Sequence, residues 1–169
     1  MAALPQNVPV QGWARLAPLG IVALGAGALA IAFTAQWGFG LQPCELCLWQ
    51  RWPYVAAIAF GILAFATKTR RGMVLLLRLA ALAFLATAAI GVFHAGVEWH
   101  WWAGLPSCSA APAANSLEAL RNQLLAAPIV RCDEPAFVFL GLSMAGWNVL
   151  YAVVAALFSF GAARDARNW

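Results

Sequence analysis

Four long apolar stretches constrain the fold of this chain more than any other feature of its sequence. They run from about residue 16 to 36, 48 to 67, 73 to 94 and 136 to 163. Each can cross a bilayer core of about 30 Å, which takes about 20 helical residues. Because 64% of the 169 residues are hydrophobic and 9% are charged, a water-soluble fold could not bury the apolar surface. The sequence therefore predicts an all-α integral membrane protein, a single domain of residues 1–169 with four transmembrane helices.

Basic residues predict how this bundle is oriented. They flank the apolar stretches at one end of the predicted bundle, at Arg15, Lys68, Arg70, Arg71, Arg164 and Arg167. By the positive-inside rule this end and both termini are cytoplasmic, and the loops of about residues 37–47 and 95–135 face outward. The first stretch is about 20 residues long and lacks a clear cleavage site, so we expect a retained helix. The net charge of +4 forms no basic stripe, which argues against a nucleic-acid partner.

All four cysteines lie in these outward loops, where an oxidising compartment allows disulfides to persist. Cys44 and Cys47 form a C-x-x-C at the mouth of the second helix, and Cys108 and Cys132 bracket the long polar stretch. Leucines at helical spacing over residues 117–125 predict a short interfacial helix. We expect that helix to hold the second loop, with its two cysteines, against the membrane surface.

The C-x-x-C lies where thiol chemistry is favoured. Unpaired backbone N–H groups at the start of a helix, together with the helix dipole, stabilise a thiolate at Cys44 or Cys47. Arg51 follows Cys47 by one helical turn and adds a permanent positive charge. A quinone, which is flat, apolar and dissolved in the bilayer, fits such a site as a two-electron acceptor. His94, at the outer end of the third stretch, is either an interfacial histidine or a proton or quinone-carbonyl partner.

Two other uses of four cysteines stay open at this point. A zinc site would need a second close-spaced pair of ligands, which Cys108 and Cys132 do not form, so we expect no metal. A structural disulfide framework is compatible with four cysteines, although a membrane bundle rarely needs one. The position of the C-x-x-C beside Arg51 favours electron transfer through disulfides.

The cysteine-containing segments resemble those of the DsbB family of disulfide bond formation proteins. The matching segments are Pro43-Cys44-x-x-Cys47-x-x-x-Arg51, Cys132-Asp133-Glu134-Pro135, Phe139-Leu140-Gly141-Leu142-Ser143-Met144 and Trp147-Asn148. The resemblance covers nearly the whole chain in the number of helices and the order of loops and cysteines. It implies a protein-dithiol:quinone oxidoreductase in the bacterial inner membrane, with its cysteine loops in the periplasm. Such an enzyme reoxidises a soluble, thioredoxin-like oxidase of the DsbA type and passes the electrons to ubiquinone, which sustains disulfide formation.

The resemblance also implies a role for each cysteine. Cys108 would be attacked by the thiolate of the soluble partner, which gives a mixed disulfide between the two proteins. Cys132, its loop partner, would then exchange with Cys44 to form a transient disulfide between the loops. Cys47 would be left as the thiolate that faces the quinone. Electrons would therefore enter at Cys108 and leave from Cys47.

Two further residues carry over as binding residues for the quinone. Arg51 would polarise the quinone ring, and His94 would make a further contact with it. The sequence around Arg51 matches the family closely, whereas Phe93, Ala95 and Gly96 around His94 are less distinctive.

Two rival classes share some of these features. A vitamin K epoxide reductase-like enzyme also combines loop cysteines, a C-x-x-C and a quinone, but its loop pair precedes the C-x-x-C in the chain. Here Cys44 and Cys47 come first, and Cys108 and Cys132 follow. A non-enzymatic membrane scaffold with structural disulfides is the second rival, and its bridges would resist exchange with a reduced protein partner.

Overall fold

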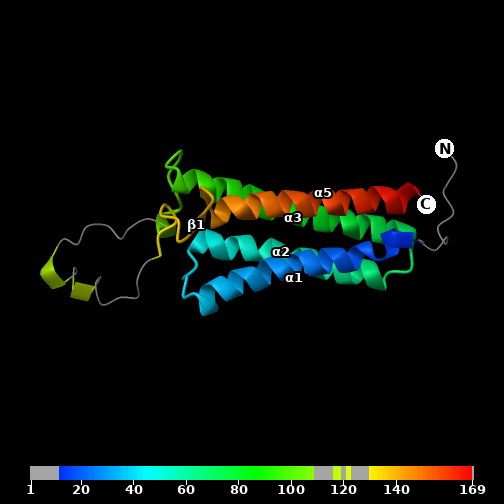
Figure 1. The fold of residues 1–169 in the computed structure, drawn as a ribbon, viewed down its shortest axis with the longest axis horizontal. Coiled ribbons are helices and arrows are strands. Elements are labelled where there is room, and N and C mark those ends of the chain that lie inside the picture. Colours follow the sequence, from blue (N-terminus) through cyan, green and yellow to red (C-terminus); the bar gives the residue numbers. More distant parts are fainter. Residues whose placement is uncertain (1–11, 109–115, 119–120, 123–129, 169) are drawn as a thin grey trace.

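Four long helices form an elongated bundle (Figure 1). The computed structural model describes residues 12–108, 116–118, 121–122 and 130–168. The long helices are α1 (Ala17–Phe33), α2 (Glu45–Ala66), α3 (Arg70–Glu98) and α5 (Met144–Asn168). A 3-10 turn, η1 (Gly12–Arg15), precedes α1, and a π-helical turn, η2 (Thr34–Gly38), extends it. All four helices are long and apolar enough to cross a membrane, which confirms the predicted fold class.

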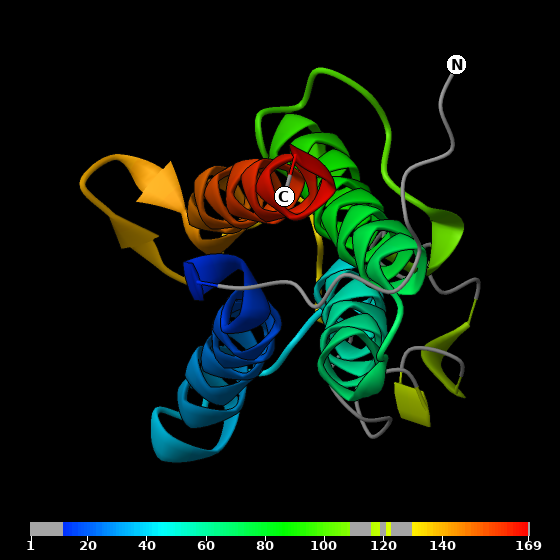
Figure 2. The same cartoon turned by 90° about the vertical axis from the view of Figure 1, so that its right-hand side faces the viewer.

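Helix α3 lies at the centre of the packing. It contacts α2 and α5 along most of its length, whereas α1 packs mainly on α2, as the view along the bundle shows (Figure 2). Phe84 and Leu77 of α3 are fully buried, and so is Ile21 of α1. Alanines line the α5 side of the core, at Ala152, Ala155, Ala156, Ala162, Ala163 and Ala166. Small side chains let helices approach closely in lipid, where van der Waals contact is the main attraction between them.

Glycine at position 61 allows α1 and α2 to pack closely. A Cβ at Gly61 would lie 2.9 Å from Val22 Cγ2 and 3.1 Å from the carbonyl oxygen of Pro18. Because that oxygen belongs to the backbone, the helices themselves would have to move apart. By contrast, a Cβ at the exposed Gly161 would meet nothing within 4 Å.

We therefore expect Gly61→Ala to lower the free energy of unfolding by about 1–3 kcal/mol, the usual cost of overpacking a core. The matched control, Gly161→Ala, should be neutral or stabilising by up to about 1 kcal/mol, because alanine favours helix. Titration with SDS, followed by circular dichroism, measures both values. Equal stabilities of the two variants would contradict close packing at Gly61.

The two ends of the bundle differ in what they hold. The turn between α2 and α3, residues 67–69, lies at the same end as η1 and the C-terminal end of α5 (Figure 1). The opposite end holds the N-terminus of α2 with Cys44, the short turn η3 (Pro106–Cys108) and a small hairpin. The four cysteines therefore share one end of the molecule.

Some helix boundaries differ from the predicted ones. Helix α5 begins at Met144, not near residue 136, because β1 (Val138–Phe139) and β2 (Leu142–Ser143) pair as an antiparallel hairpin. Leu140 and Gly141 form its turn with φ of 50° and 79°, a left-handed conformation that cannot continue a right-handed helix. Helix α2 begins at Glu45, earlier than predicted, and α3 continues past position 94 to Glu98. The predicted interfacial helix at 117–125 lies largely outside the described residues.

Candidate redox site

The C-x-x-C begins α2. Cys44 is the N-cap residue, with an extended backbone (φ −74°, ψ 173°), and its Sγ accepts a hydrogen bond from the backbone N–H of Cys47 at 3.4 Å. Cys47 therefore lies in the first helical turn, where backbone N–H groups have no partner within the helix. This cap geometry directs the positive end of the helix dipole at the Cys44 sulfur, which favours the thiolate.

The two sulfur atoms of the C-x-x-C are in direct contact as free thiols. Cys44 Sγ and Cys47 Sγ lie 3.1 Å apart, within hydrogen-bond distance, and Cys44 is buried while Cys47 is half-buried. The hydrogen bond from the Cys47 thiol holds the pKa of Cys44 well below its ordinary value, with a smaller contribution from His94, although burial opposes both. In the reduced pair, the negative charge therefore resides on Cys44.

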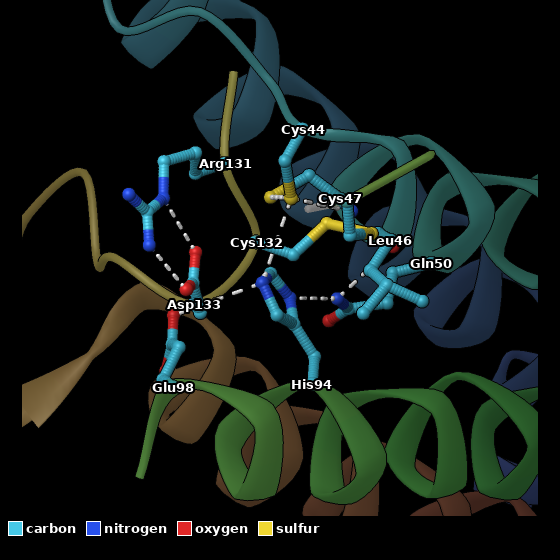
Figure 3. The surroundings of a disulfide bond; sticks show 10 residues. Cys44, Leu46, Cys47, Gln50, His94, Glu98, Arg131, Cys132 and Asp133 are labelled. Carbon is cyan, nitrogen blue, oxygen red and sulfur yellow. Dashed lines mark hydrogen bonds and ion pairs between the residues drawn. A yellow bond between two sulfur atoms is a disulfide. The ribbon is translucent and has the colours of Figure 1, made fainter. Parts of the chain in front are cut away.

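His94 reaches this pair from α3. Its ring is 3% exposed, its Nε2 lies 3.5 Å from Cys44 Sγ, and its Nδ1 lies 2.9 Å from Gln50 Nε2 (Figure 3). Glu98 follows one turn later, with Oε1 3.8 Å from His94 Nε2, and accepts a short hydrogen bond from the Ser143 hydroxyl. His94 is thus a buried residue of the thiol site and not an interfacial histidine.

The second cysteine pair lies against the first. A disulfide joins Cys108 to Cys132, and both residues are at most 2% exposed. These two and Cys44 form one buried apolar cluster with Leu46 and Val97. Three partly buried residues pack against this cluster: Cys47, Leu105 and Val130. The structure therefore brings all four cysteines together at the N-terminus of α2. Cys108 and Cys132 form a disulfide, whereas Cys44 and Cys47 are reduced.

Arg51 faces a different side of α2 from the histidine. Its Nη1 donates to Gln36 Oε1 at 2.7 Å, and its guanidinium lies 4.9 Å from the centre of the Phe33 ring. Phe33 stacks on Trp37 with ring centres 4.9 Å apart. Arg51 Nε is buried and has no hydrogen-bond partner among the described residues. A half-buried cation with an unused donor beside flat aromatic surface suits a ring that carries carbonyl oxygens, so these residues fit a quinone.

Two glutamines of the site were not predicted from the sequence. Gln50 contacts His94, and Gln36 contacts Arg51. Gln50 also links to the polar side chains of other helices, because its Oε1 accepts from Asn148 Nδ2 at 2.7 Å. A signal was present, since an amide at position 50, within an apolar helix and next to Arg51, needs partners. The sequence alone could not say which residues those partners are.

The low pKa of Cys44 predicts how its reactivity depends on pH. In a Cys108→Ala/Cys132→Ala background, we expect alkylation of Cys44 by iodoacetamide to persist well below pH 8.5, about the ordinary pKa of a thiol. Because the folded-state pKa is lowered, this thiolate stabilises the folded protein at high pH, and the contribution is lost as pH falls through the lowered value. Mass spectrometry of the alkylated peptide gives the rate at each pH.

Cys47→Ala removes the hydrogen bond to Cys44, so the midpoint of alkylation should rise toward the ordinary value. Cys47→Ser keeps a donor and should shift it less. An identical midpoint in all three proteins would contradict a thiolate held by Cys47.

A four-helix membrane bundle with a helix-capping C-x-x-C against a loop disulfide defines a class, the membrane proteins that carry out thiol–disulfide chemistry. Residues 14–162 match the family described as Disulfide bond formation protein DsbB. The chain belongs to the DsbB family, which confirms the resemblance seen in its motifs. It is therefore a multi-pass bacterial membrane protein with a redox role in disulfide bond formation.

Individual relatives agree with this membership. The chain is 33% identical over 159 residues to a Disulfide bond formation protein B of Dechloromonas aromatica (strain RCB), covering 85% of this chain and 86% of that one. It is 30% identical over 156 residues to that of Marinobacter nauticus, with 85% and 90% covered. An uncharacterized protein of Rickettsia prowazekii (strain Madrid E) is 27% identical over 141 residues, with 82% and 81% covered. No solved structure matches the chain.

Proposed function

We propose that this protein reoxidises a soluble, thioredoxin-like oxidase of the DsbA type and passes the electrons to ubiquinone. The observation that carries the proposal is the cluster in which the Cys108–Cys132 disulfide packs against Cys44 and Cys47. Exchange between two pairs needs such proximity, because a thiolate must reach a sulfur of the other pair. Membership of the DsbB family supports the same assignment.

The first half of the reaction is thiol–disulfide exchange. The partner's thiolate attacks Cys108, so that a mixed disulfide forms, the Cys108–Cys132 bond breaks and Cys132 leaves as a thiolate. When Cys44 and Cys47 are in the disulfide form, Cys132 then attacks Cys44 and releases Cys47 as a thiolate. The partner's second thiol attacks the mixed disulfide, which completes its oxidation and frees Cys108. A hollow of about 330 Å³ opens beside Cys108 and is lined in part by Trp102 and Asp133.

The second half moves two electrons into the membrane. A quinone accepts two electrons and two protons at its ring and remains dissolved in the bilayer. Cys108 displaces Cys44 from Cys132 and restores the loop disulfide, which leaves Cys44 and Cys47 reduced. These two then lose two electrons and two protons as their own disulfide re-forms. The Arg51 guanidinium lies over the Phe33 ring and its Nε–H has no partner among the described residues, so in this proposal Arg51 orients the quinone ring there.

His94 serves this half-reaction at Cys44. Its Nε2 lies against the Cys44 sulfur, so it stabilises the thiolate. Its ring is buried and both nitrogens face protein groups, so the contact with the quinone that the family resemblance implies stays a prediction. In the same proposal, η1 and the end of α5 lie in the cytoplasm and the cysteine loops in the periplasm, as Lys68, Arg70 and Arg71 indicate.

One assay tests this function. The purified protein, in detergent or lipid, is given ubiquinone and a reduced thioredoxin-like oxidase of its own organism. We expect one dithiol to be oxidised for each quinone reduced, as followed by the ultraviolet absorbance of the quinone and by thiol titration. If the protein reacts with neither substrate, and its disulfide bonds stay intact in the presence of the reduced oxidase, it is instead a structural scaffold.

A further inference from the structure

We propose that Gln50 is a positioning residue: it fixes the tautomer of His94 and so keeps Cys44, Cys47 and His94 a redox thiol site that does not bind a metal. The identity of Cys44 and Cys47 as the redox pair rests on the proposed function. The tautomer and the metal affinity are properties of the folded protein and stand without it.

The three side chains form a set that a metal could use. The sulfur atoms of Cys44 and Cys47 and a ring nitrogen of His94 all lie within 4.8 Å of one another. Two thiolates and an imidazole are a common ligand set for zinc, and Glu98, 3.8 Å from His94 Nε2, could supply a fourth ligand. Binding requires that the nitrogen facing the sulfurs carry no proton, because a metal takes its lone pair.

Hydrogen bonds fix the direction in which the Gln50 amide points. Its Nε2 lies 3.2 Å from the carbonyl oxygen of Leu46, which can only accept, so the NH₂ group must be on that side. Its Oε1 accepts from Asn148 Nδ2 at 2.7 Å, and Asn148 Oδ1 accepts from the Tyr54 hydroxyl at 2.6 Å. Turning the Gln50 amide over would break the bonds with Leu46 and Asn148 together.

This orientation decides where the proton of His94 resides. The NH₂ group of Gln50 lies 2.9 Å from His94 Nδ1, so Nδ1 must accept and is without a proton. In a neutral imidazole the proton is then on Nε2, the nitrogen that lies 3.5 Å from Cys44 Sγ. Nε2 therefore donates to the thiolate and offers no lone pair to a metal. The Gln50 amide thus keeps a proton on His94 Nε2, and this proton both stabilises the Cys44 thiolate and prevents Nε2 from binding zinc.

The direct test is ¹⁵N NMR of the reduced, full-length protein labelled at histidine, with His100→Gln to assign the two rings. We expect the wild-type spectrum to show His94 protonated at Nε2 and unprotonated at Nδ1. Gln50→Leu should give a mixture of tautomers. Ser159→Ala, which removes a buried hydroxyl bonded within α5 to Ala155, is the control and should leave the His94 signals unchanged. A wild-type proton on Nδ1 would overturn the proposal.

The second test measures zinc. Gln50→Glu keeps the shape of the side chain but accepts a proton from Nδ1, which frees Nε2 in the manner of carboxylate–histidine–zinc sites. We expect the reduced Gln50→Glu variant to bind Zn²⁺ at least about tenfold more tightly than wild type, a difference of about 1.4 kcal/mol. Competition with a chromophoric chelator gives both affinities. Equal affinities, in folded proteins, would overturn the role of Gln50 in excluding the metal.

The two proposals fail separately. If wild type does not turn over with ubiquinone but shows the Nε2–H tautomer, the function is wrong and the positioning role stands. If wild type turns over but His94 carries its proton on Nδ1, the positioning role is wrong and the function stands.

Discussion

Replacement of Cys108 by serine should reduce turnover with the protein partner to the rate measured without enzyme. A serine hydroxyl cannot form the mixed disulfide, because the thiolate is the attacking group and a sulfur is the leaving atom in every exchange step. The readout is quinone reduction with the reduced oxidase as electron donor. Full activity of Cys108→Ser with the protein partner would show that electrons enter elsewhere.

The double variant Cys108→Ser/Cys132→Ser separates the two halves of the relay. We expect its Cys44 and Cys47, reduced beforehand with a small dithiol, still to be oxidised by ubiquinone in a single turnover. The matched double variant Cys44→Ser/Cys47→Ser should keep the loop disulfide but reduce no quinone. Loss of quinone reduction in both double variants would mean that the pairs act as one structural unit.

Removal of the Arg51 charge should have the second-largest effect. We expect Arg51→Leu to raise KM for ubiquinone about 10- to 100-fold. This is the effect of losing a hydrogen bond from a charged donor, worth about 1.5–3 kcal/mol, at tenfold per 1.4 kcal/mol. KM for the protein partner should stay within about twofold, because Arg51 faces Phe33 and Gln36 and not Cys108. Steady-state kinetics with each substrate varied in turn gives both values.

Two controls make the Arg51 result specific. Arg78→Leu changes an exposed arginine of α3, in the half of the bundle away from the cysteines, and should leave both KM values unchanged. Gln36→Leu removes the partner that orients the guanidinium and should raise KM for the quinone less than Arg51→Leu does. An unchanged quinone KM in Arg51→Leu would contradict a binding role for this residue.

The contribution of sequence and of tertiary contact can be seen by comparing Arg51 with Gln50. Arg51 was predicted because it lies one turn after Cys47 in a motif that resembles the DsbB family. Gln50 was not, because its importance comes from His94 in α3 and Asn148 in α5, which are distant along the chain. The contact of Glu98 with Ser143 also depends on the fold, because the two residues are 45 positions apart in the chain.

The start of α5 shows a second limit of sequence reasoning. The residues from 136 onward are apolar enough to extend a membrane helix, yet the chain forms a hairpin through Leu140 and Gly141 before Met144. Hydropathy reports that a segment is apolar but not its backbone dihedral angles. A positive φ at Leu140, which has no special tolerance for it, could be seen only in the fold.

The sequence by itself determined the four membrane helices, the placement of two cysteines in each of two loops, and membership of the DsbB family. Apolar length and motif spacing are local properties of a chain, and these features depend on nothing else. Only the tertiary structure decided that the Cys108–Cys132 disulfide packs against Cys44 and that His94 contacts the Cys44 sulfur. These contacts join segments more than 40 residues apart, so they exist only once α2, α3 and the second loop have packed together.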